Sequence, residues 1–215
     1  MLHYLLLIYV PNAKENSKMG EHNAKDRMLA AALELFHAKG VNATGISEIL
    51  KKSDTGKGQF THYFKNKDGL IRSVVEFLFA IIREGRTSTG YDLATWEDFA
   101  NWFQTYIDYQ KSVDYKNSCP IGTIGNDLSD KQEIIRLDIR IFLEWTRGKL
   151  TRFFSERKAA GDLVETADPD ALADLCIAVM QGGMLMTKVR RNPDIFENSA
   201  KQTLAFIEQL KTRSQ

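Results

Sequence analysis

Residues 44–70 read TGISEILKKSDTGKGQFTHYFKNKDGL, and they are the most informative part of the sequence. Its pattern predicts a short helix, a turn at residues 53–56, a second short helix over residues 57–63 and the start of a third. The second helix carries small and polar side chains where an ordinary surface helix carries long ones. Because short side chains let a helix backbone enter the major groove of DNA, we predict a helix-turn-helix here.

Helical periodicity extends on both sides of this stretch. Apolar residues at Leu29, Ala32, Leu33 and Phe36 predict a helix over residues 24–39, which Gly40 ends. Thr44 is predicted to be the N-cap of the next helix. Further helices are predicted over residues 66–83, 95–115, 130–160 and 169–191 and after Pro193, with a bend around a very short helix near residues 119–130.

No segment alternates with a period of two, so the predicted fold is all-α. We expect an N-terminal helix-turn-helix three-helix DNA-binding domain and a C-terminal helical ligand-sensing and dimerisation domain. The expected boundaries are residues 1–18 for a flexible N-terminal extension, 19–72 for the DNA-binding domain and 73–215 for the sensing domain. Met19 opens a more usual start than the apolar residues 2–10, which lack the basic flank and cleavage site of a signal peptide.

Composition is that of a soluble globular protein, with 43% hydrophobic and 27% charged residues. Residues 19–72 carry nine Lys and Arg against six Asp and Glu, a charge of +3, whereas residues 73–215 carry eighteen against twenty-one, a charge of −3. A basic head on an acidic body suits binding to phosphates at one end. The two cysteines show no metal-ligand spacing, and no uncharged run reaches the ~20 residues that span a bilayer, so we expect a cytoplasmic protein without metal or cofactor.

Residues 57–63 supply the parts that a recognition helix needs. Phe60 and Phe64 are the expected buried anchors, and Gly56 and Gly58 the positions of close approach. Glutamine can pair with adenine in the major groove, threonine can contact a base or a methyl group, and lysine neutralises phosphate. The predicted DNA-contacting residues are Thr44, Lys57, Gly58, Gln59, Thr61, His62, Tyr63 and Lys67.

The segment KGQFTHYFKNKDGL closely resembles the tetracycline-repressor (TetR) family of bacterial transcription regulators. The resemblance is specific over residues 24–72 and implies a dimer that binds double-stranded operator DNA. Thr61 stands where the family often has tyrosine, and Gly56 where serine or proline is usual.

A second stretch, NSCPIGTIGNDLSD at residues 117–130, is similar to a motif of one TetR subgroup. That subgroup includes regulators of detoxifying reductases and of multidrug-type transport, and in it the matching cysteine can sense electrophiles. Here the match is Cys119, preceded by Ser118 instead of glycine. Two interpretations stay open: a thiol that is modified, and a small buried apolar residue.

Aromatic and methionine side chains recur on the long helices, either as plain core or as the lining of an effector cavity. The helix over residues 169–191 is apolar nearly all round, so we expect it to be buried on several sides and to hold a homodimer together with the last helix. Gly182 and Gly183 within it indicate close packing against a partner helix. The predicted ligand-binding residues are Trp102, Phe103, Tyr106, Cys119, Phe142, Trp145, Met180, Gln181 and Met184.

These observations predict a DNA-binding regulator, a repressor released from its operator by a small hydrophobic effector. The alternative switch is modification of Cys119. An enzyme is disfavoured because the sequence has no Ser/His/Asp set, no phosphate loop and no HExxH motif. A binding protein that has lost DNA recognition is a third interpretation, and a shift assay with its own promoter separates it from the first two.

Overall fold

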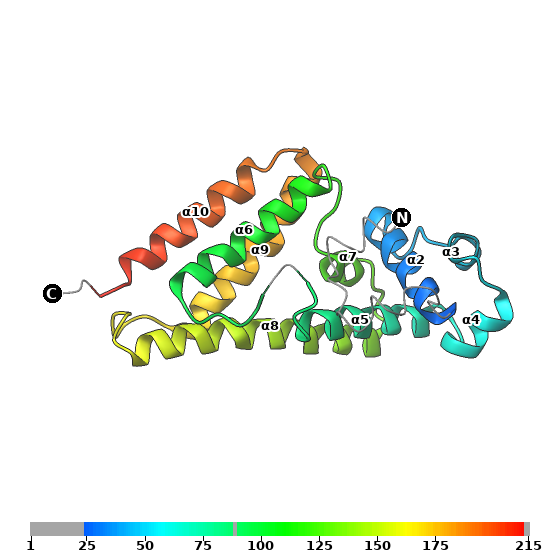
Figure 1. Cartoon of the computed structure of the whole chain (residues 1–215), viewed down its shortest axis with the longest axis horizontal. Coiled ribbons are helices and arrows are strands. Elements are labelled where there is room, and N and C mark those ends of the chain that lie inside the picture. Colours follow the sequence, from blue (N-terminus) through cyan, green and yellow to red (C-terminus); the bar gives the residue numbers. More distant parts are fainter. Residues whose placement is uncertain (1–23, 88–89, 213–215) are drawn as a thin grey trace, which may run out of the picture. The chain divides into compact units, whose positions relative to one another are not determined.

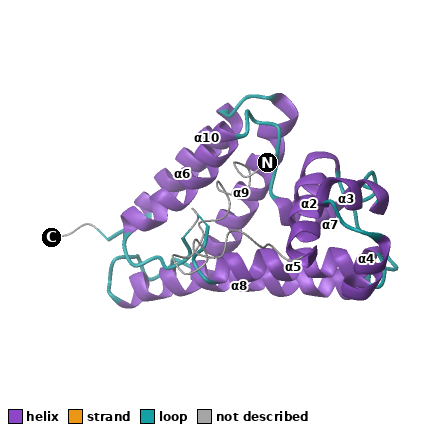
Figure 2. Ribbon diagram, turned by 45° about the vertical axis from the view of Figure 1, so that its right-hand side comes forward, coloured by secondary structure: helices purple, strands orange, loops and turns teal. Residues whose placement is uncertain are grey.

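The computed structural model describes residues 24–87 and 90–212, and their regular segments are helices joined by short loops (Figures 1 and 2). Within these residues the only strand-like pairing is an isolated bridge between Leu163 and Lys211. The expected N-terminal extension, residues 1–18, lies outside the described residues. The helices are α2 (Ala24–Lys39), α3 (Ile46–Ser53), α4 (Lys57–Phe64), α5 (Lys67–Arg83), α6 (Trp96–Ser112), α7 (Pro120–Asn126), α8 (Glu133–Ala159), α9 (Pro169–Arg190) and α10 (Asp194–Gln209).

The chain divides into two compact units. Among the described residues, the first unit holds 24–87 and 119–141, and the second holds 90–118 and 142–212. Helix α7 and the first turns of α8 therefore group with α2–α5, and the rest of α8 groups with α6, α9 and α10. The limits of these compact units differ from the predicted boundary between the DNA-binding and sensing domains at residue 72. That boundary stays a prediction.

In the first unit, α2 packs on α3, α4, α5 and α7. Met28, Phe36 and Ile49 are fully buried between these helices. Gly40 ends α2 in the left-handed region, with φ of 89°, as a glycine after a helix commonly does. An ion pair of 2.6 Å between Arg72 Nε and Asp138 Oδ2 joins α5 to α8.

In the second unit, rings from α6 and α8 form the core. Phe99 stacks on Phe153 with centroids 5.5 Å apart and meets Phe154 edge to face at 5.1 Å. Such ring pairs add to the hydrophobic stabilisation that their burial supplies. The Thr95 side chain and Asp98 cap the start of α6, each accepting a hydrogen bond from a backbone N–H of the other residue.

Helices α9 and α10 pack closely within one protomer. A Cβ atom added at Gly183 would lie 2.2 Å from the Phe196 ring, whereas one added at Gly182 would meet nothing within 4 Å. Gly183 therefore makes room for α10 of its own chain, and the sequence-based assignment of its packing to a partner helix is wrong. Gly182 lies on the exposed face of α9.

Apolar burial also differs from expectation on two helices. Ile134 and Ile141, taken from the periodicity of α8 as part of its apolar face, are 59% and 58% exposed. By length and composition α9 is apolar enough to cross a membrane, but one such helix is weak support for a span. Since α9 packs against both α6 and α10, it is a core helix with one face left open.

Candidate nucleic-acid interface and sensor core

Helix α4 presents its polar side chains outward from two buried rings. Phe60 and Phe64 are each 3% exposed, with ring centroids 5.7 Å apart. Helix α4 packs through them against α2 and α5. The remaining residues of α4, which include Lys57, Gly58 and Gln59, are exposed, as the sequence predicts for a recognition helix.

The rotation of about 100° per residue in α4 determines which exposed side chain points furthest away from Phe60 and Phe64. Each residue advances the direction by about 100°, which places His62 opposite the midpoint between Phe60 and Phe64. Gly58 and Gln59 lie within about 60° of His62, and Thr61 and Tyr63 lie about 100° to either side. His62, Gly58 and Gln59 therefore form the outermost ridge of α4.

Gln59 has a second task at the start of α4. Its Oε1 accepts a hydrogen bond of 3.0 Å from the backbone N–H of Gly56, which is the N-cap residue. Glycine has no side chain to cap a helix, so Gln59 satisfies one of the N–H groups that a helix start leaves open. With Oε1 engaged, the amide Nε2 of Gln59 remains as a donor on the exposed face.

A tight connection joins α4 to α5. Lys65 lies in the left-handed region with φ of 65°, and Asn66 caps α5 by accepting from the Gly69 N–H at 2.9 Å. A Cβ atom at Gly69 would lie 2.0 Å from the Phe64 carbonyl oxygen, so only glycine fits there. Lys67, the first residue of α5, follows this turn and brings a positive charge to the N-terminus of that helix.

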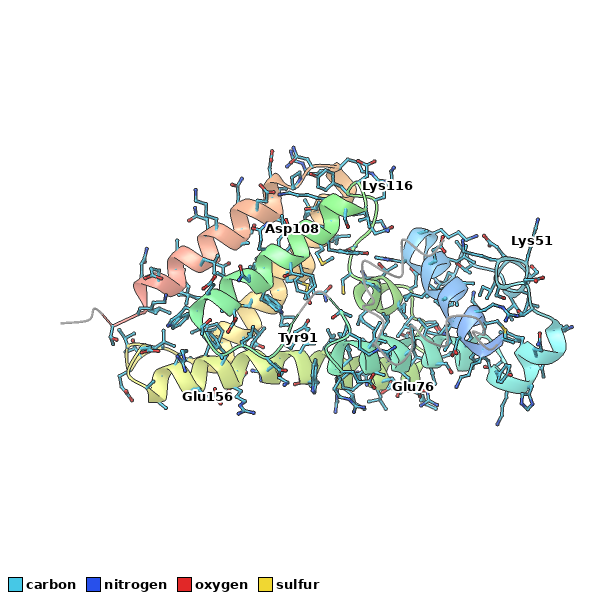
Figure 3. All side chains as sticks on the ribbon, in the orientation of Figure 1. Lys51, Glu76, Tyr91, Asp108, Lys116 and Glu156 are labelled. Atoms are coloured by element: carbon cyan, nitrogen blue, oxygen red, sulfur yellow. The ribbon has the colours of Figure 1, made fainter. Side chains whose placement is uncertain are left out.

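Thr44 was predicted to contact DNA, but the structure buries its side chain. The N-cap of α3 is Gly45, and no side chain caps that helix. Thr44 is 1% exposed, and its hydroxyl donates to the Gly40 carbonyl at 2.7 Å. The predicted N-cap is therefore wrong, and a buried, engaged hydroxyl is not available to a phosphate. By contrast, Lys51 near the end of α3 projects into solvent (Figure 3).

Asp127 ties α7 to the loop after α2. Its Oδ2 accepts from the backbone N–H of Val41 at 2.6 Å and of Asn42 at 3.3 Å, and its carbonyl accepts from the Asn42 side chain at 2.8 Å. The same carboxylate lies where a Cβ on Gly40 would be. Part of the motif at residues 117–130 thus serves to hold α7 against α2 and the loop that follows it.

In the second unit, several aromatic side chains form a cluster with Trp102. Trp102 meets Tyr106 edge to face at 5.2 Å, and Tyr91 contacts Trp102 at 6.2 Å and Trp145 at 5.3 Å. The hydroxyls of Tyr91 and Tyr106 are hydrogen-bonded to each other. Tyr91, labelled in Figure 3, precedes α6 in a loop, so no helical period in the sequence pointed to it.

Buried polar atoms without a partner accompany this cluster. Among the described residues, Trp102 Nε1 has no acceptor, although the residue is almost fully buried. Gln110, a buried residue absent from the predicted set, donates to the Met184 carbonyl at 2.8 Å, while its Oε1 lacks a donor. Most buried polar groups in proteins are hydrogen-bonded, so each of these atoms is available to a buried water molecule or to a ligand group.

The other predicted ligand-binding residues are distributed over both units. Phe103 packs on Phe196 of α10, with centroids 6.5 Å apart, and meets Trp102 edge to face at 4.9 Å. Cys119 belongs to the first unit and is the N-cap of α7. Of the rest, Phe142, Met180 and Met184 are buried and Gln181 is partly exposed.

Both cysteines are buried and reduced in the described chain. Burial raises the pKa of the Cys176 thiol to about 12, which keeps it protonated and unreactive. Lys116, the cation nearest to Cys119 in sequence, forms an ion pair of 2.8 Å with Asp114. No group of three His, Cys, Asp or Glu residues able to hold a metal ion occurs among residues 24–87 and 90–212.

The first unit carries a short, exposed polar helix held on two buried rings, and the second unit has a core with buried polar atoms that lack a partner. Together these features define a helix-turn-helix transcriptional regulator. Residues 28–74 match the model of bacterial regulatory proteins of the tetR family, and residues 97–203 match the tetracyclin repressor-like C-terminal domain. The chain belongs to the TetR family. Its members are DNA-binding regulators and not enzymes.

The chain aligns with related proteins over most of their length. The chain is 32% identical over 185 residues to an HTH-type transcriptional regulator in lacX 3'region of Lactococcus lactis subsp. lactis, covering 82% of this chain and 89% of the relative. It is 24% identical over 177 residues to the HTH-type transcriptional repressor DhaR of Mycobacterium sp. (strain GP1), covering 81% and 87%. The crystal structure of regulatory protein TetR from Rhodobacter sphaeroides shares the fold, with a TM-score of 0.74 at 24% identity, covering 85% of this chain and 97% of the other.

Proposed function

We propose that this protein is a cytoplasmic repressor that binds operator DNA as a homodimer and leaves it when a small hydrophobic effector binds. The observation that carries the proposal is α4, a short helix with a polar, exposed face held on two buried rings. The name of the relative DhaR supports repression as the sign of regulation. Residues 19–72 are assigned to DNA binding and residues 73–215 to sensing and dimerisation.

The DNA contacts divide by position on α4. His62, Gly58 and Gln59 form the outer ridge and face base edges when the helix enters the major groove. Gly58 has nothing within 4 Å of an added Cβ, so no contact in the protomer requires a glycine, which is the less favourable residue for a helix. Close approach to DNA supplies a reason for it. Lys57, Lys67, Thr61 and Tyr63 lie at the end or flanks of this ridge, where phosphates run.

TetR-family regulators act as dimers, and α9 and α10 supply a face for this one. Leu185, Met186 and Val189 on α9 and Phe206 on α10 are large apolar side chains left exposed by the protomer. Contiguous exposed apolar residues of this kind mark interaction surfaces. Gly182 on the same side of α9 adds no side chain, which allows a partner helix to approach closely.

The effector is assigned to the cluster around Trp102. Trp102 Nε1 is a buried donor without an acceptor. The ring of Tyr106 lies beside Trp102, and the ring of Trp145 joins the same cluster through Tyr91. A molecule with an apolar body and one hydrogen-bond acceptor complements this arrangement. Its binding favours a conformation whose two recognition helices no longer match two half-sites, and affinity for the operator falls.

The DNA-binding part is tested with the upstream region of the protein's own gene in a fluorescence anisotropy titration over a range of salt concentrations. Lys57→Ala and Lys67→Ala are each expected to lower the slope of log affinity against log salt by about 1, because each removes one phosphate contact. Lys201→Ala, on α10, serves as the control and should leave the slope unchanged. No binding to the upstream region above the level for random DNA would refute the proposal.

The effector part is tested with Trp102→Phe, which keeps the ring and removes the N–H donor. A panel of aromatic ketones supplies apolar probes that carry an acceptor. We expect any ketone that releases the wild-type protein from DNA to bind Trp102→Phe less well by about tenfold, since one buried hydrogen bond is lost. Equal release of wild type and variant would remove Trp102 from the site.

Modification of Cys119 is the second candidate switch, because a helix N-terminus such as that of α7 stabilises a thiolate. Brief treatment with N-ethylmaleimide followed by mass spectrometry compares it with Cys176, whose raised pKa makes it the internal control. We expect Cys119 to be modified faster and modified protein to leave the operator. If Cys119 stays unmodified in the folded protein, or if modified protein still binds DNA, this switch is excluded.

A further inference from the structure

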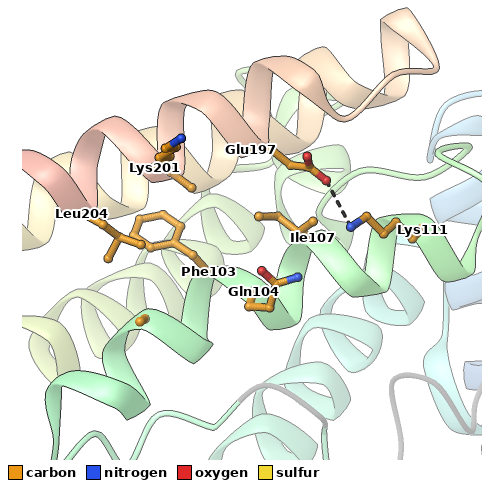
Figure 4. Close-up of a pocket in the computed structure, with 9 residues that line it drawn as sticks. Phe103, Gln104, Ile107, Lys111, Glu197, Lys201 and Leu204 are labelled. Atoms are coloured by element: carbon orange, nitrogen blue, oxygen red, sulfur yellow. Dashed lines mark ion pairs between the residues drawn. The ribbon is translucent and has the colours of Figure 1, made fainter.

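A groove with a volume of about 310 Å³ lies between α6 and α10 in the second unit (Figure 4). Its floor comes from the side of α6 that faces α10, and one residue of that floor, Phe103, also meets Trp102 edge to face at 4.9 Å. Phe103 and Ile107 rise from α6, and Leu204 comes from α10. Ala100 and Ala200 line the groove as well, and their short side chains leave the space open. The volume is at the lower end of the range for small-molecule sites.

The rim of the groove carries two positive side chains and one negative side chain. Lys111 of α6 forms an ion pair of 3.1 Å with Glu197 of α10, which closes one end of the groove (Figure 4). Lys201 lies one turn beyond Glu197 on α10, in a position to form an i, i+4 pair with it, but Glu197 pairs across the groove instead. Within residues 24–87 and 90–212 no acidic side chain lies within ion-pair distance of Lys201, which leaves one positive charge beside the apolar floor.

We propose that this groove binds a small amphipathic monocarboxylate, with the carboxylate at Lys201 and the apolar part on Phe103, Ile107 and Leu204. The charge of the rim selects the class of ligand. Lys111 and Glu197 neutralise each other, so the groove complements one negative charge and no more. The size of the groove selects an apolar body of about one ring or a short branched chain.

The groove stays open in the proposed dimer. Successive residues of α10 advance by about 100°, which puts Glu197, Lys201 and Leu204 on the side of the helix roughly opposite to Phe206. A partner that covers Phe206 therefore leaves Lys201 accessible. Trp102 itself does not line the groove, so the carboxylate site is an addition to the effector site proposed at Trp102, and it does not depend on DNA binding.

The test compares phenylacetate with phenylacetamide, which has the same shape without the charge, by ligand-observed NMR on the full chain. We expect phenylacetate to bind more tightly than the amide, and added salt to weaken only phenylacetate because it screens the contact with Lys201. Lys201→Met keeps the length of the side chain and is expected to reduce the affinity for phenylacetate about fivefold, the factor for one solvated pair of unit charges, without changing that for the amide. Lys131→Met, in an exposed loop of the first unit, is the matched control and should change neither.

Ala100→Phe fills the groove and is expected to abolish binding of both probes, with the folded state checked by circular dichroism. Equal affinity for the acid and the amide, or an unchanged affinity of Lys201→Met for phenylacetate, would overturn the carboxylate site. Binding that survives Ala100→Phe in folded protein would place the probes elsewhere, and absence of binding by either probe to the wild type would also refute the proposal.

Discussion

At the scale of single residues, side chains with two tasks shape the proposed DNA interface. Gln59 accepts from the Gly56 N–H through Oε1 and presents Nε2 to solvent. The first contact supports the start of α4, and the second is available for a base. A glycine at the N-cap is tolerated here because a side chain from the first turn replaces the missing cap.

Gln59→Ala is predicted to weaken binding to the operator by about 1–3 kcal/mol and to relax the preference at one base position, because a contact to a base edge is lost. Gln59→Glu keeps an oxygen for the Gly56 N–H but has no amide donor, so its melting temperature should match that of the wild type while its operator preference also relaxes. Anisotropy titrations with operator and random DNA measure both effects. A parallel loss of affinity for the two DNAs would show that Gln59 does not read a base.

Gly40 combines a left-handed backbone with a close contact, since an added Cβ would lie 2.4 Å from Asp127 Oδ2. Gly40→Ala is therefore predicted to lower the free energy of unfolding by about 1–3 kcal/mol. Gly148→Ala on α8, where an added Cβ meets nothing within 4 Å, should raise it by up to about 1 kcal/mol. Urea denaturation of both variants gives the two values, and equal stability of Gly40→Ala and the wild type would contradict the assignment.

At the scale of helices, local signals in the sequence were sufficient for most of the bounds. Gly40 ends α2, and Asp168 with Pro169 starts α9, because caps and stops act within a few residues. Long-range packing was not encoded in such signals. Periodicity on α8 could not show that Ile134 is left exposed, and two adjacent glycines could not show that only Gly183 meets Phe196.

The same contrast between local signals and long-range packing explains which site residues could be predicted. The exposed face of α4 followed from the sequence since a short helix has few ways to bury two phenylalanines. Thr44 was misplaced because the chain needs its hydroxyl at the end of α2, one turn back, instead of at the start of α3. Tyr91 and Gln110 were missed because their partners, Tyr106 and Met184, are brought to them only by the tertiary fold.

The capping of α6 makes a prediction about pH. Hydrogen bonds from the backbone N–H groups of Thr95 and Ala94, and then from the Thr95 side chain, lower the pKa of Asp98. A carboxylate with a lowered pKa in the folded state stabilises that state above its unfolded pKa, and the contribution is lost as pH falls through the folded pKa. Asp98→Asn should therefore reduce the melting temperature near neutral pH and have little effect in acid.

Glu97→Gln, one residue away, is the control for removing a charge from the first turn of α6, because the described residues give Glu97 no hydrogen bond. Melting temperatures from pH 2 to pH 8 distinguish the two variants. A deficit in Asp98→Asn that is the same at every pH would mean that side-chain packing, and not the charge of Asp98, supports the helix start.

At the scale of the whole molecule, the function requires two copies. A helix-turn-helix dimer reads two half-sites about one turn of DNA apart, so the surface that joins the protomers sets the spacing of the recognition helices. Gly183 is unsuitable for testing that surface because a charge there would meet Phe196 of the same chain and disrupt the protomer. Val189, at 68% exposure the most open of the large apolar residues on α9, is a better position.

Val189→Glu is predicted to give a folded monomer, because dimerisation would bury an unpaired carboxylate at a cost of several kcal/mol. Ile134→Glu makes the same change at a comparably exposed apolar residue of α8 and should leave the dimer intact. Size-exclusion chromatography with light scattering gives the mass, and anisotropy on a full operator and on a half-site gives the consequence. The monomer should bind both DNAs with the same weak affinity, whereas the wild type and Ile134→Glu should prefer the full operator. If Val189→Glu remains a dimer and Ile134→Glu does not, the protomers meet through α8, and the assignment of α9 and α10 must be abandoned.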